Sequence, residues 1–485
     1  MDSSFNSDVL RRLPLAEAVL TAYQWALDDS FLADIWKRFR GRCYEKLISF
    51  SSMVSLVFDA LVCYGSGRQA FHQGQQREVL VASMQAAYQK LGKLPLKLSE
   101  AFLSGTTDRL LQILPDATPP AVAEFPSLAA FRPMILDGKA VKQVPRRLLP
   151  LRRSKKKCLG GKALVALDHQ RQLAMGMATS PDGETNEASL VPALVADITS
   201  RVAEPLLWIG DRQFFGLGHA KAFTARAGDH FLVRYNATLP FTPDPDRAEQ
   251  QGVDRHGRKI TQEWGWIGKE KNPQRRYVRR LRVHRDGEDL VLMTSLLETT
   301  CLAEELLELY FRRWGIERVF QKITEVFDLR QLIGTTAQAT MFQLAFCLML
   351  YNLMVLVASH VIEKPKPTAK DPEKKEKLSL QDISLEMLFE DVRRQLISVE
   401  TMMTSDDAIE ILEPIPTAAQ ARRKLRALLA SQWDSLWRKT NRKRGRPMPT
   451  ANKDRPSKHR SVFRLIKEYK ELQAKRKRKL KRDGP

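Results

Sequence analysis

The chain has 485 residues, which is too long for one hydrophobic core of ordinary size, so we expect two to four domains. Its 43% hydrophobic and 8% aromatic content does not fit a globally disordered chain. Lys and Arg number 79 against 56 Asp and Glu, and the resulting net charge of +23 favours a polyanionic partner, either nucleic acid or an anionic membrane surface.

The first 125 residues predict a helical N-terminal domain, which we expect to bind DNA. Apolar residues recur at helical spacing in Leu15–Leu27 and in Met53–Val62. The pair Pro119–Pro120 separates this region from the next one.

Short apolar runs bounded by turn residues follow, and they predict strands of a mixed sheet. These runs are Met134–Leu136, Ala163–Leu167, Leu173–Ala178 and Leu206–Ile209, with a helix expected at Ala188–Ser200. The pattern indicates an α/β catalytic domain.

A second group of strands is predicted before the next helices, at His230–Tyr235, Glu263–Ile267, Arg276–His284 and Leu290–Ser295. Gly, Pro and Asp separate them. We interpret the region of about 216–300 as a β-rich insertion within a catalytic domain that spans 126–362.

Leu302–Phe327 has helical periodicity, and a second, very apolar helix is expected after it. Met341–Ile362 contains no Asp, Glu, Lys or Arg and is long enough to span a bilayer. It also contains Gln343, Asn352 and His360, so we favour a helix buried in a large domain. A membrane helix is the alternative.

The C-terminal part begins with three prolines among Lys and Glu in 363–377, which predict an exposed linker. Residues 378–440 are predicted to be helical, and 441–485 form a tail with 18 basic and 4 acidic residues. Basic residues also concentrate in Lys139–Lys162 and Lys269–Arg285. Any one run also fits a solvated surface, but three runs favour nucleic acid over a membrane.

Five scattered cysteines form no Cys-x2-Cys pair and no Cys/His cluster, so neither a zinc site nor a secreted disulfide framework is indicated. The N-terminus lacks the basic-then-apolar pattern of a signal peptide. We expect a reducing, cytoplasmic setting.

Two aspartates follow buried strands directly. Asp137 comes after Met134–Leu136, and Asp211 comes after Leu206-Leu207-Trp208-Ile209-Gly210. If the strands are neighbours, their ends would bring two carboxylates together, as hard cations such as Mg²⁺ require. Each Asp alone also fits a turn residue or a helix cap.

A third carboxylate is predicted on a helix. Tyr310, Arg313 and Glu317 have spacings of three and four, which place them on one helix face. A surface Arg–Glu pair worth ~0.3–0.5 kcal/mol is the alternative. Three carboxylates together could hold two metal ions, which activate an attacking oxygen and stabilise a leaving oxygen in phosphodiester displacement.

The motifs MILDGKAV, LLWIGDRQFF and LYFRRWGIERVFQKI resemble those of the DDE transposases of bacterial insertion sequences, specifically the insertion-sequence-four family. The last motif resembles the Tyr-x2-Arg-x3-Glu-x6-Lys signature, and the resemblance covers roughly residues 125–360. It implies a ribonuclease-H-like core in which Asp137, Asp211 and Glu317 are catalytic and bind two Mg²⁺ or Mn²⁺ ions.

The resemblance also implies the reaction and the partners. Strands are cut at transposon ends, and the freed 3′-hydroxyls are joined to target DNA by a homodimer in the bacterial cytoplasm. Tyr310 and Arg313 would contact terminal phosphates of double-stranded DNA. The signature Lys falls at position 324, which is Thr324, and Lys322 is the nearest lysine. The alternative is therefore a catalytically impaired DNA-binding protein derived from a transposase.

Three further features are candidates for DNA contacts or support. Trp264 and Trp266 could stack a flipped base, although packing also explains them. Arg444 and Arg446, in Lys-Arg-Gly-Arg-Pro, resemble the centre of an AT-hook, which enters a narrow minor groove. The pair Asn186–Glu187 is explained most simply as the cap of the helix that follows.

Overall fold

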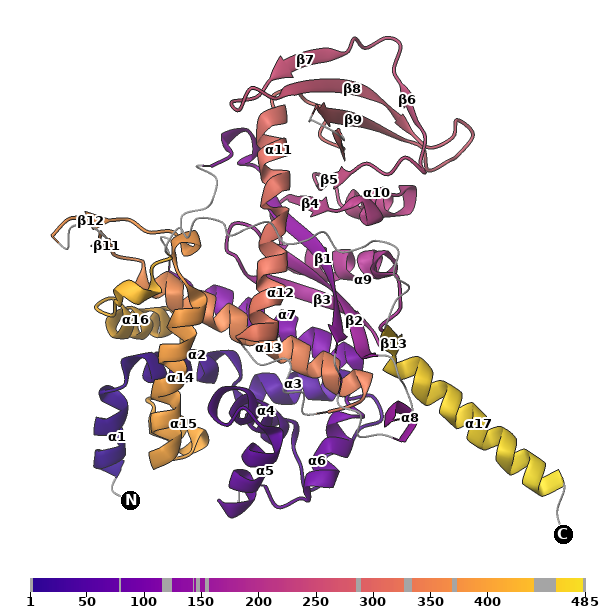
Figure 1. Cartoon of the computed structure of the whole chain (residues 1–485). Coiled ribbons are helices and arrows are strands. Elements are labelled where there is room, and N and C mark those ends of the chain that lie inside the picture. The colour runs from indigo at the N-terminus through magenta and orange to yellow at the C-terminus, as the bar shows by residue number, and fades with distance from the viewer. Residues whose placement is uncertain are drawn as a thin grey trace.

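A computed structural model of the whole chain shows a helical body, a large mixed sheet and a projecting C-terminal helix (Figure 1). The structure describes residues 3–77, 80–115, 124–142, 144, 149–152, 157–284, 289–326, 334–368, 373–439 and 459–482. Together these form an α/β protein, consistent with a ribonuclease-H-like transposase core.

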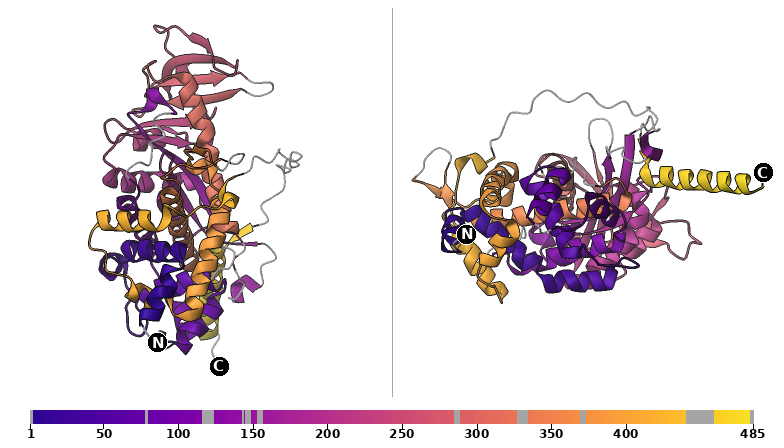
Figure 2. Two further views of the ribbon diagram at one scale, coloured as in Figure 1. Left: turned by 90° about the vertical axis from the view of Figure 1, so that its left-hand side faces the viewer. Right: turned by 90° about the horizontal axis from the view of Figure 1, so that it is seen from below.

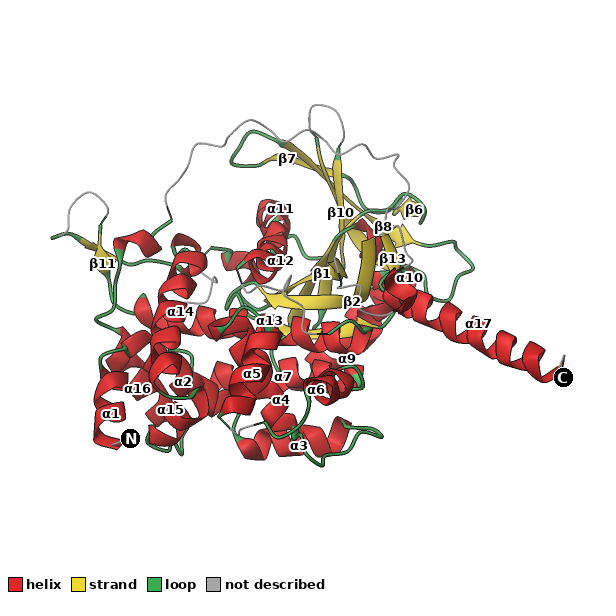
Figure 3. Cartoon of the chain, turned by 60° about the horizontal axis from the view of Figure 1, so that its bottom comes forward, coloured by secondary structure: helices red, strands yellow, loops and turns green. Residues whose placement is uncertain are grey.

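The N-terminal region is helical, as predicted. Its α-helices are α1 (Ser3–Arg11), α2 (Pro14–Ala26), α3 (Asp29–Phe39), α4 (Phe50–Phe58), α5 (Gly67–Gln76), α6 (Met84–Leu91) and α7 (Leu96–Gln112), with a π-turn, η1 (Asp59–Cys63). They pack against the rest of the chain: α7 lies on a strand of the sheet and on a long apolar helix, and α2 contacts helices from the C-terminal region (Figure 3). Phe50 and Phe102 join this shared core through stacked and edge-on rings.

The region predicted to be catalytic contains a mixed sheet, and each predicted apolar run coincides with a strand to within one residue. The strands are β1 (Arg132–Lys142), β2 (Lys157–Asp168), β3 (Ala174–Ser180), β4 (Leu206–Gly210) and β5 (His230–Arg234). β2 pairs antiparallel with both β1 and β3, while β1, β4 and β5 run parallel to one another. Near-continuous burial of β1 and β4 explains their unbroken apolar runs.

The predicted β-rich insertion extends this same sheet, because β10 pairs with β5. Its strands are β6 (Phe241–Pro243), β7 (Gln250–Val253), β8 (Lys259–Ile267), β9 (Arg276–Val283) and β10 (Leu290–Thr294). They form the upper part of the molecule in Figure 1. The helix expected at Ala188–Ser200 is a 3-10 turn, η4 (Glu187–Leu190), followed by α9 (Val191–Arg201).

The single helix predicted at Leu302–Phe327 is interrupted. It consists of α11 (Ala303–Phe311), a 3-10 turn η6 (Arg312–Trp314) and α12 (Gly315–Glu325). The expectation of one continuous helix was therefore wrong, because the turn tightens from four-residue to three-residue hydrogen bonding at this point.

The apolar helix is α13 (Ala337–Val361). It is long and apolar enough to cross a membrane, yet the apolar window is wholly buried inside the protein. Its polar residues have partners there: Asn352 bonds both the amide and the carbonyl of Ala174, and the His360 Nε2 lies 2.9 Å from the Ile113 carbonyl. The helix therefore serves as the centre of the core.

The C-terminal region folds back on the body. Lys366–Pro367 (β11) and Lys375–Glu376 (β12) pair as a short hairpin where a linker is predicted. The helices that follow are α14 (Leu385–Met402), α15 (Ser405–Ile411) and α16 (Ala418–Leu429). Two 3-10 turns, η7 (Leu380–Asp382) and η8 (Ser435–Trp437), flank them.

The basic tail ends in a strand and a helix. β13 (His459–Ser461) adds parallel to β2 at the sheet edge, and α17 (Val462–Arg482) then projects away from the body (Figure 2). Arg464 joins the base of α17 to the turn after β3 by ion pairs with Asp182 and Glu184. Arg444 and Arg446 lie outside the described residues.

Candidate active site

The register of β1 and β4 places two aspartates side by side. Ile135 is paired with Ile209 in the parallel ladder, and Asp137 and Asp211 each lie two residues further on. Because side chains alternate along a strand, both aspartates lie at the same level and belong to the same face of adjacent chains ~4.8 Å apart. The prediction that the two aspartates lie on neighbouring strands agrees with the pairing, but the prediction that Asp137 ends its strand was wrong. β1 continues to Lys142, and Asp137 is paired with Val165 of β2, whereas Asp211 directly follows β4.

Backbone amides orient both carboxylates. The Gly138 N–H donates to Asp137 Oδ1 at 2.9 Å, and the Arg212 N–H donates to Asp211 Oδ1 at 2.7 Å. Asp211 is also the N-cap of the 3-10 turn η5 (Arg212–Phe214). It therefore has the capping role that the sequence analysis gave as the alternative to metal binding. Each aspartate keeps a second oxygen with no hydrogen bond to the described residues.

Glu317 comes from the first turn of α12. Its carboxylate lies 3.7 Å from the Arg313 guanidinium, which is buried in the preceding 3-10 turn. The Glu317 side chain is 41% exposed, so this pair alone contributes little to stability. The Arg313 guanidinium also lies 6.0 Å from the ring centroid of Tyr310, which is buried on α11.

The pKa values show that these groups form one electrostatic cluster. Burial raises the pKa of Asp137 to about 6; the Glu187 and Glu317 carboxylates also raise it, whereas the Gly138 amide and Arg313 lower it. Burial likewise raises the pKa of Glu317, and Asp211 adds to this rise while Arg313 opposes it. Like charges held together in this way are typical of functional sites.

The chemistry of the donors fits divalent metal ions. Asp137, Asp211 and Glu317 offer carboxylate oxygens, which Mg²⁺ and Mn²⁺ prefer. Among the described residues, the group of three ligands whose atoms lie within 4.8 Å of one another is Asp59, Cys63 and Glu400, and Glu400 there pairs with Arg77. The oxygens of the candidate site are therefore spread more widely than such a tight group.

A fourth carboxylate reaches the site from η4. The Glu187 Oε2 occupies the space beside Gly138, where an added Cβ would come within 1.0 Å of it. Its other oxygen lies 3.9 Å from the Lys162 ammonium. The prediction that Asn186 caps this turn is confirmed, since its side chain accepts from the Ala188 amide. Glu187 itself lies near Asp137 and raises its pKa. From the sequence, this pair is a candidate supporting feature, with helix capping favoured as its explanation.

Arg234, the last residue of β5, is a further member. Burial raises the pKa of Tyr310, the Arg313 and Arg234 guanidinium groups lower it, and Asp211 raises it. Arg234 therefore lies with Tyr310 and Arg313 near the strand ends. Sequence reasoning missed it because its position depends on the pairing of β5 with β4, and no local pattern reports that pairing.

Other predicted DNA-contacting residues lie elsewhere. Lys322 is partly buried against the ring of Tyr351, around α12 from Glu317. Trp264 is fully buried, donates to the Leu297 carbonyl and packs under Arg247, so it has a packing role in this structure. Trp266 is partly buried against Tyr277, with ring centroids 4.8 Å apart.

Asp137 within β1, Asp211 directly after β4 and Glu317 on α12 thus form a group of carboxylates beside a mixed sheet. Residues 132–353, from β1 into α13, match the family model described as the transposase DDE domain. This match supports a DDE transposase, with DNA as its substrate and, in general, a metal-dependent nuclease or transposase activity. No curated protein matches the chain.

Proposed function

We propose that this protein is a transposase of the insertion-sequence-four type. It binds the terminal inverted repeats of its element, cuts DNA strands there and joins the 3′-hydroxyl ends to target DNA. The observation that carries the proposal is the equal register of Asp137 and Asp211 beside Glu317. We further propose that the protein acts as a homodimer in the bacterial cytoplasm, as this class of element requires two ends to be brought together.

In this proposal the three carboxylates bind metal ions, and Arg313 positions Glu317 and a phosphate. Asp137, Asp211 and Glu317 would hold two Mg²⁺ or Mn²⁺ ions, which when bound supply activation of the attacking oxygen and stabilisation of the leaving oxygen. The two aspartates are fixed by a rigid sheet and by backbone amides, so they keep their geometry without the substrate. Arg313 also restrains Glu317 and can bind a phosphate through its remaining N–H donors.

DNA would be positioned by cations around the strand ends. Arg313 and Arg234, with Tyr310 between their charges and that of Asp211, would contact the phosphates, and phosphate contacts set register without reading sequence. The basic helix α17, joined to the turn after β3 by Arg464, adds affinity that falls steeply with salt. The catalytically impaired alternative is less favoured, because a protein that only binds DNA has no chemical need for all three carboxylates.

Nicking of DNA that carries the element's own ends tests the proposal. Wild type with Mg²⁺ should nick at the ends, and Asp211→Asn should lose at least a thousandfold in rate while keeping its DNA affinity, since only the metal-holding group changes. Calorimetric titration with Mn²⁺ supplies a readout other than activity: binding should weaken in the same variant. Equal nicking and equal Mn²⁺ affinity in both proteins would refute the assignment.

A further inference from the structure

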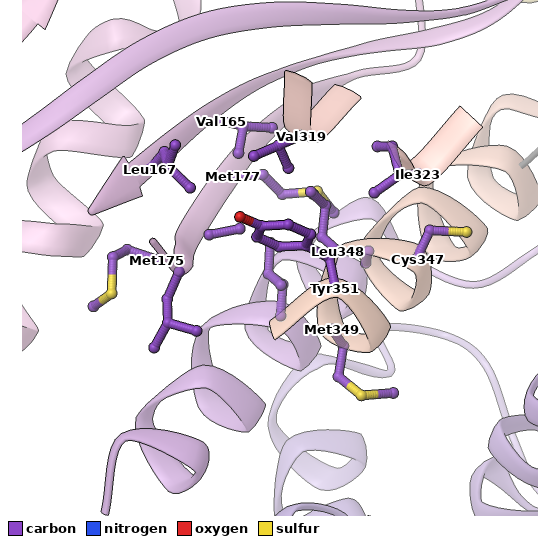
Figure 4. Packing of buried hydrophobic residues seen from close by; sticks show 14 of the residues in the cluster. Val165, Leu167, Met175, Met177, Val319, Ile323, Cys347, Leu348, Met349 and Tyr351 are labelled. Atoms are coloured by element: carbon purple, nitrogen blue, oxygen red, sulfur yellow. The ribbon is translucent and has the colours of Figure 1, made fainter. Parts of the chain in front are cut away.

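A cavity of about 110 Å³ lies on the other side of α12 from the candidate active site. Lys322 faces it, five residues after Glu317 and therefore ~140° around the helix at ~100° per residue. Residues of α12, of α13 and of the segment from η7 into α14 form its walls. Figure 4 shows the Tyr351 ring, part of its lining, packed among Val319 and Ile323 of α12 and Val165 of β2.

The lining of this cavity is cationic. None of the residues that line it is acidic, and four of them carry a positive charge: Arg312, Arg318, Lys322 and Lys439. The carboxylates that attract these cations do not line the cavity: Glu386 attracts Lys322, and Asp382 attracts Lys439. Glu124 and Glu308 pair with Arg312. Charges of the same sign repel one another more strongly around a partly enclosed cavity with apolar lining residues than on an open surface, because the effective dielectric constant is lower.

Two of the four cations lack a partner. Arg312 pairs with Glu124 and Glu308, and Lys439 donates to the Gln381 carbonyl at 2.5 Å. By contrast, the side chains of Arg318 and Lys322 make no hydrogen bond or ion pair with any described residue, although the Lys322 ammonium lies 6.0 Å from the centroid of the Tyr351 ring. Burial, with smaller contributions from Lys439 and Arg318, lowers the pKa of Lys322 to about 8, and Glu386 opposes this change.

A buried polar atom beside the cavity is also unsatisfied. His169 is 4% exposed and lines the cavity, and its Nε2 has no hydrogen-bond partner. Buried polar groups in proteins nearly always have partners, so an orphan next to unpaired cations points to a missing ligand. At ~30 Å³ for each water molecule, the cavity holds the equivalent of three to four waters, which suits one tetrahedral oxyanion.

We propose that this cavity binds a phosphate group, with Lys322 and Arg318 as its principal ligands. Arg318 offers paired N–H donors that match two phosphate oxygens, and Lys322 supplies a point charge from the cavity floor. A bound phosphate would neutralise the repulsion and join α12 to the C-terminal helices. The phosphate can belong to a DNA backbone that passes behind the catalytic helix, or to a free phosphate or nucleotide. The site goes beyond the proposed transposase chemistry and does not depend on it.

Calorimetric titration of the full-length protein with inorganic phosphate, at constant ionic strength, tests the site. Wild type should bind one phosphate saturably, and Lys322→Met should weaken that binding at least tenfold, because Met keeps the packing of the stem without the charge. Lys37→Met is the matched control, since it removes one exposed lysine of α3 and should leave the affinity unchanged. Arg318→Gln, on the exposed side of α12, gives an independent result if Lys322→Met folds poorly.

Competition with duplex DNA then shows whether the bound phosphate belongs to DNA or to a free ligand. If the phosphate belongs to DNA, duplex should displace inorganic phosphate and Lys322→Met should bind duplex more weakly. If the ligand is free, the phosphate affinity should be the same with and without duplex. Asp211→Asn should bind phosphate as wild type does, so failure of the catalytic proposal would not affect this one. Equal phosphate affinity in wild type, Lys322→Met and Arg318→Gln would overturn the proposal.

Discussion

The two faces of α12 gather charges of opposite sign. Towards the strand ends, Glu317 joins Asp137, Asp211 and Glu187, and the pKa values of Asp137 and Glu317 rise. Around the same helix, Lys322 joins three other cations, and its pKa falls.

Both pKa shifts have the same physical cause: burial and neighbouring charges of the same sign disfavour the charged form of the side chain. A bound ligand of opposite charge would reduce this electrostatic cost. One short helix thus separates a site suited to cations from a site suited to anions.

The largest effect should come from removing the charge on the carboxylate face. Glu317→Gln should lower the nicking rate by at least a thousandfold, because a neutral amide is a poor ligand for Mg²⁺. Its phosphate affinity, measured by calorimetry, should stay at the wild-type value if the two faces are independent. Gln321→Ala, an exposed neighbour on α12, is the control and should nick normally. A parallel loss of phosphate binding in Glu317→Gln would contradict the separation of the faces.

A methyl group at position 138 should be almost as harmful to nicking. In Gly138→Ala the new Cβ would collide with the Glu187 carboxylate, so either Glu187 or β1 must move. We expect about a hundredfold slower nicking and about 1–3 kcal/mol of lost stability in urea unfolding, as for other overpacked sites.

Gly218→Ala serves as the control, since no atom lies within 4 Å of its added Cβ. Combining Gly138→Ala with Glu187→Ala should restore stability. If the double variant is no more stable than Gly138→Ala alone, the collision is not the cause.

Asp137→Asn should stabilise the metal-free protein while abolishing nicking. The folded-state pKa of Asp137, about 6, lies above its usual 3.8, so ionised Asp137 destabilises the fold above pH 6 and this cost disappears as the pH falls below about 4. Asn removes it, and we expect a gain on the order of 1–3 kcal/mol at pH 7.5 and none at pH 3.5. Urea unfolding at the two pH values measures this difference; a destabilised variant at pH 7.5 would contradict it.

The smallest effect should come from adding a cation to the carboxylate face. Position 324 lies seven residues after Glu317 and thus on nearly the same side of α12. In this structure the Thr324 hydroxyl donates to the Phe320 carbonyl at 2.6 Å. Thr324→Lys should raise affinity for duplex DNA a few-fold and steepen its salt dependence, by an added phosphate contact. Unchanged affinity across salt concentrations, measured by fluorescence anisotropy, would place this face away from DNA.

Much of the fold could be predicted because local patterns specify it. Unbroken apolar runs located β1 and β4, and the absence of charge in α13 indicated a buried helix. The interruption of the helix at Arg312–Trp314 was missed, since no proline marks it. The docking of β13 on β2 was also missed, because it depends on contacts about 300 residues apart in sequence.

The candidate site also contains residues that local patterns predict and residues that only long-range contacts bring together. Asp137, Asp211 and Glu317 could be proposed from strand ends and helix spacing. Arg234 and the position of Glu187 over Gly138 require the pairing of the sheet. The cationic cavity joins α12 to residues near 380 and 439, and no local sequence pattern reveals that meeting.

The central claim is that Asp137, Asp211 and Glu317 form one metal site, and iron-directed backbone cleavage tests it most directly. Fe²⁺ substituted for Mg²⁺, with ascorbate and peroxide, generates radicals that cut the chain beside the bound ion. The account predicts cuts close to residues 137, 211 and 317, suppressed by excess Mg²⁺ and lost in Asp211→Asn. Cuts confined to the region of Asp59 and Glu400, or unchanged in Asp211→Asn, would contradict it.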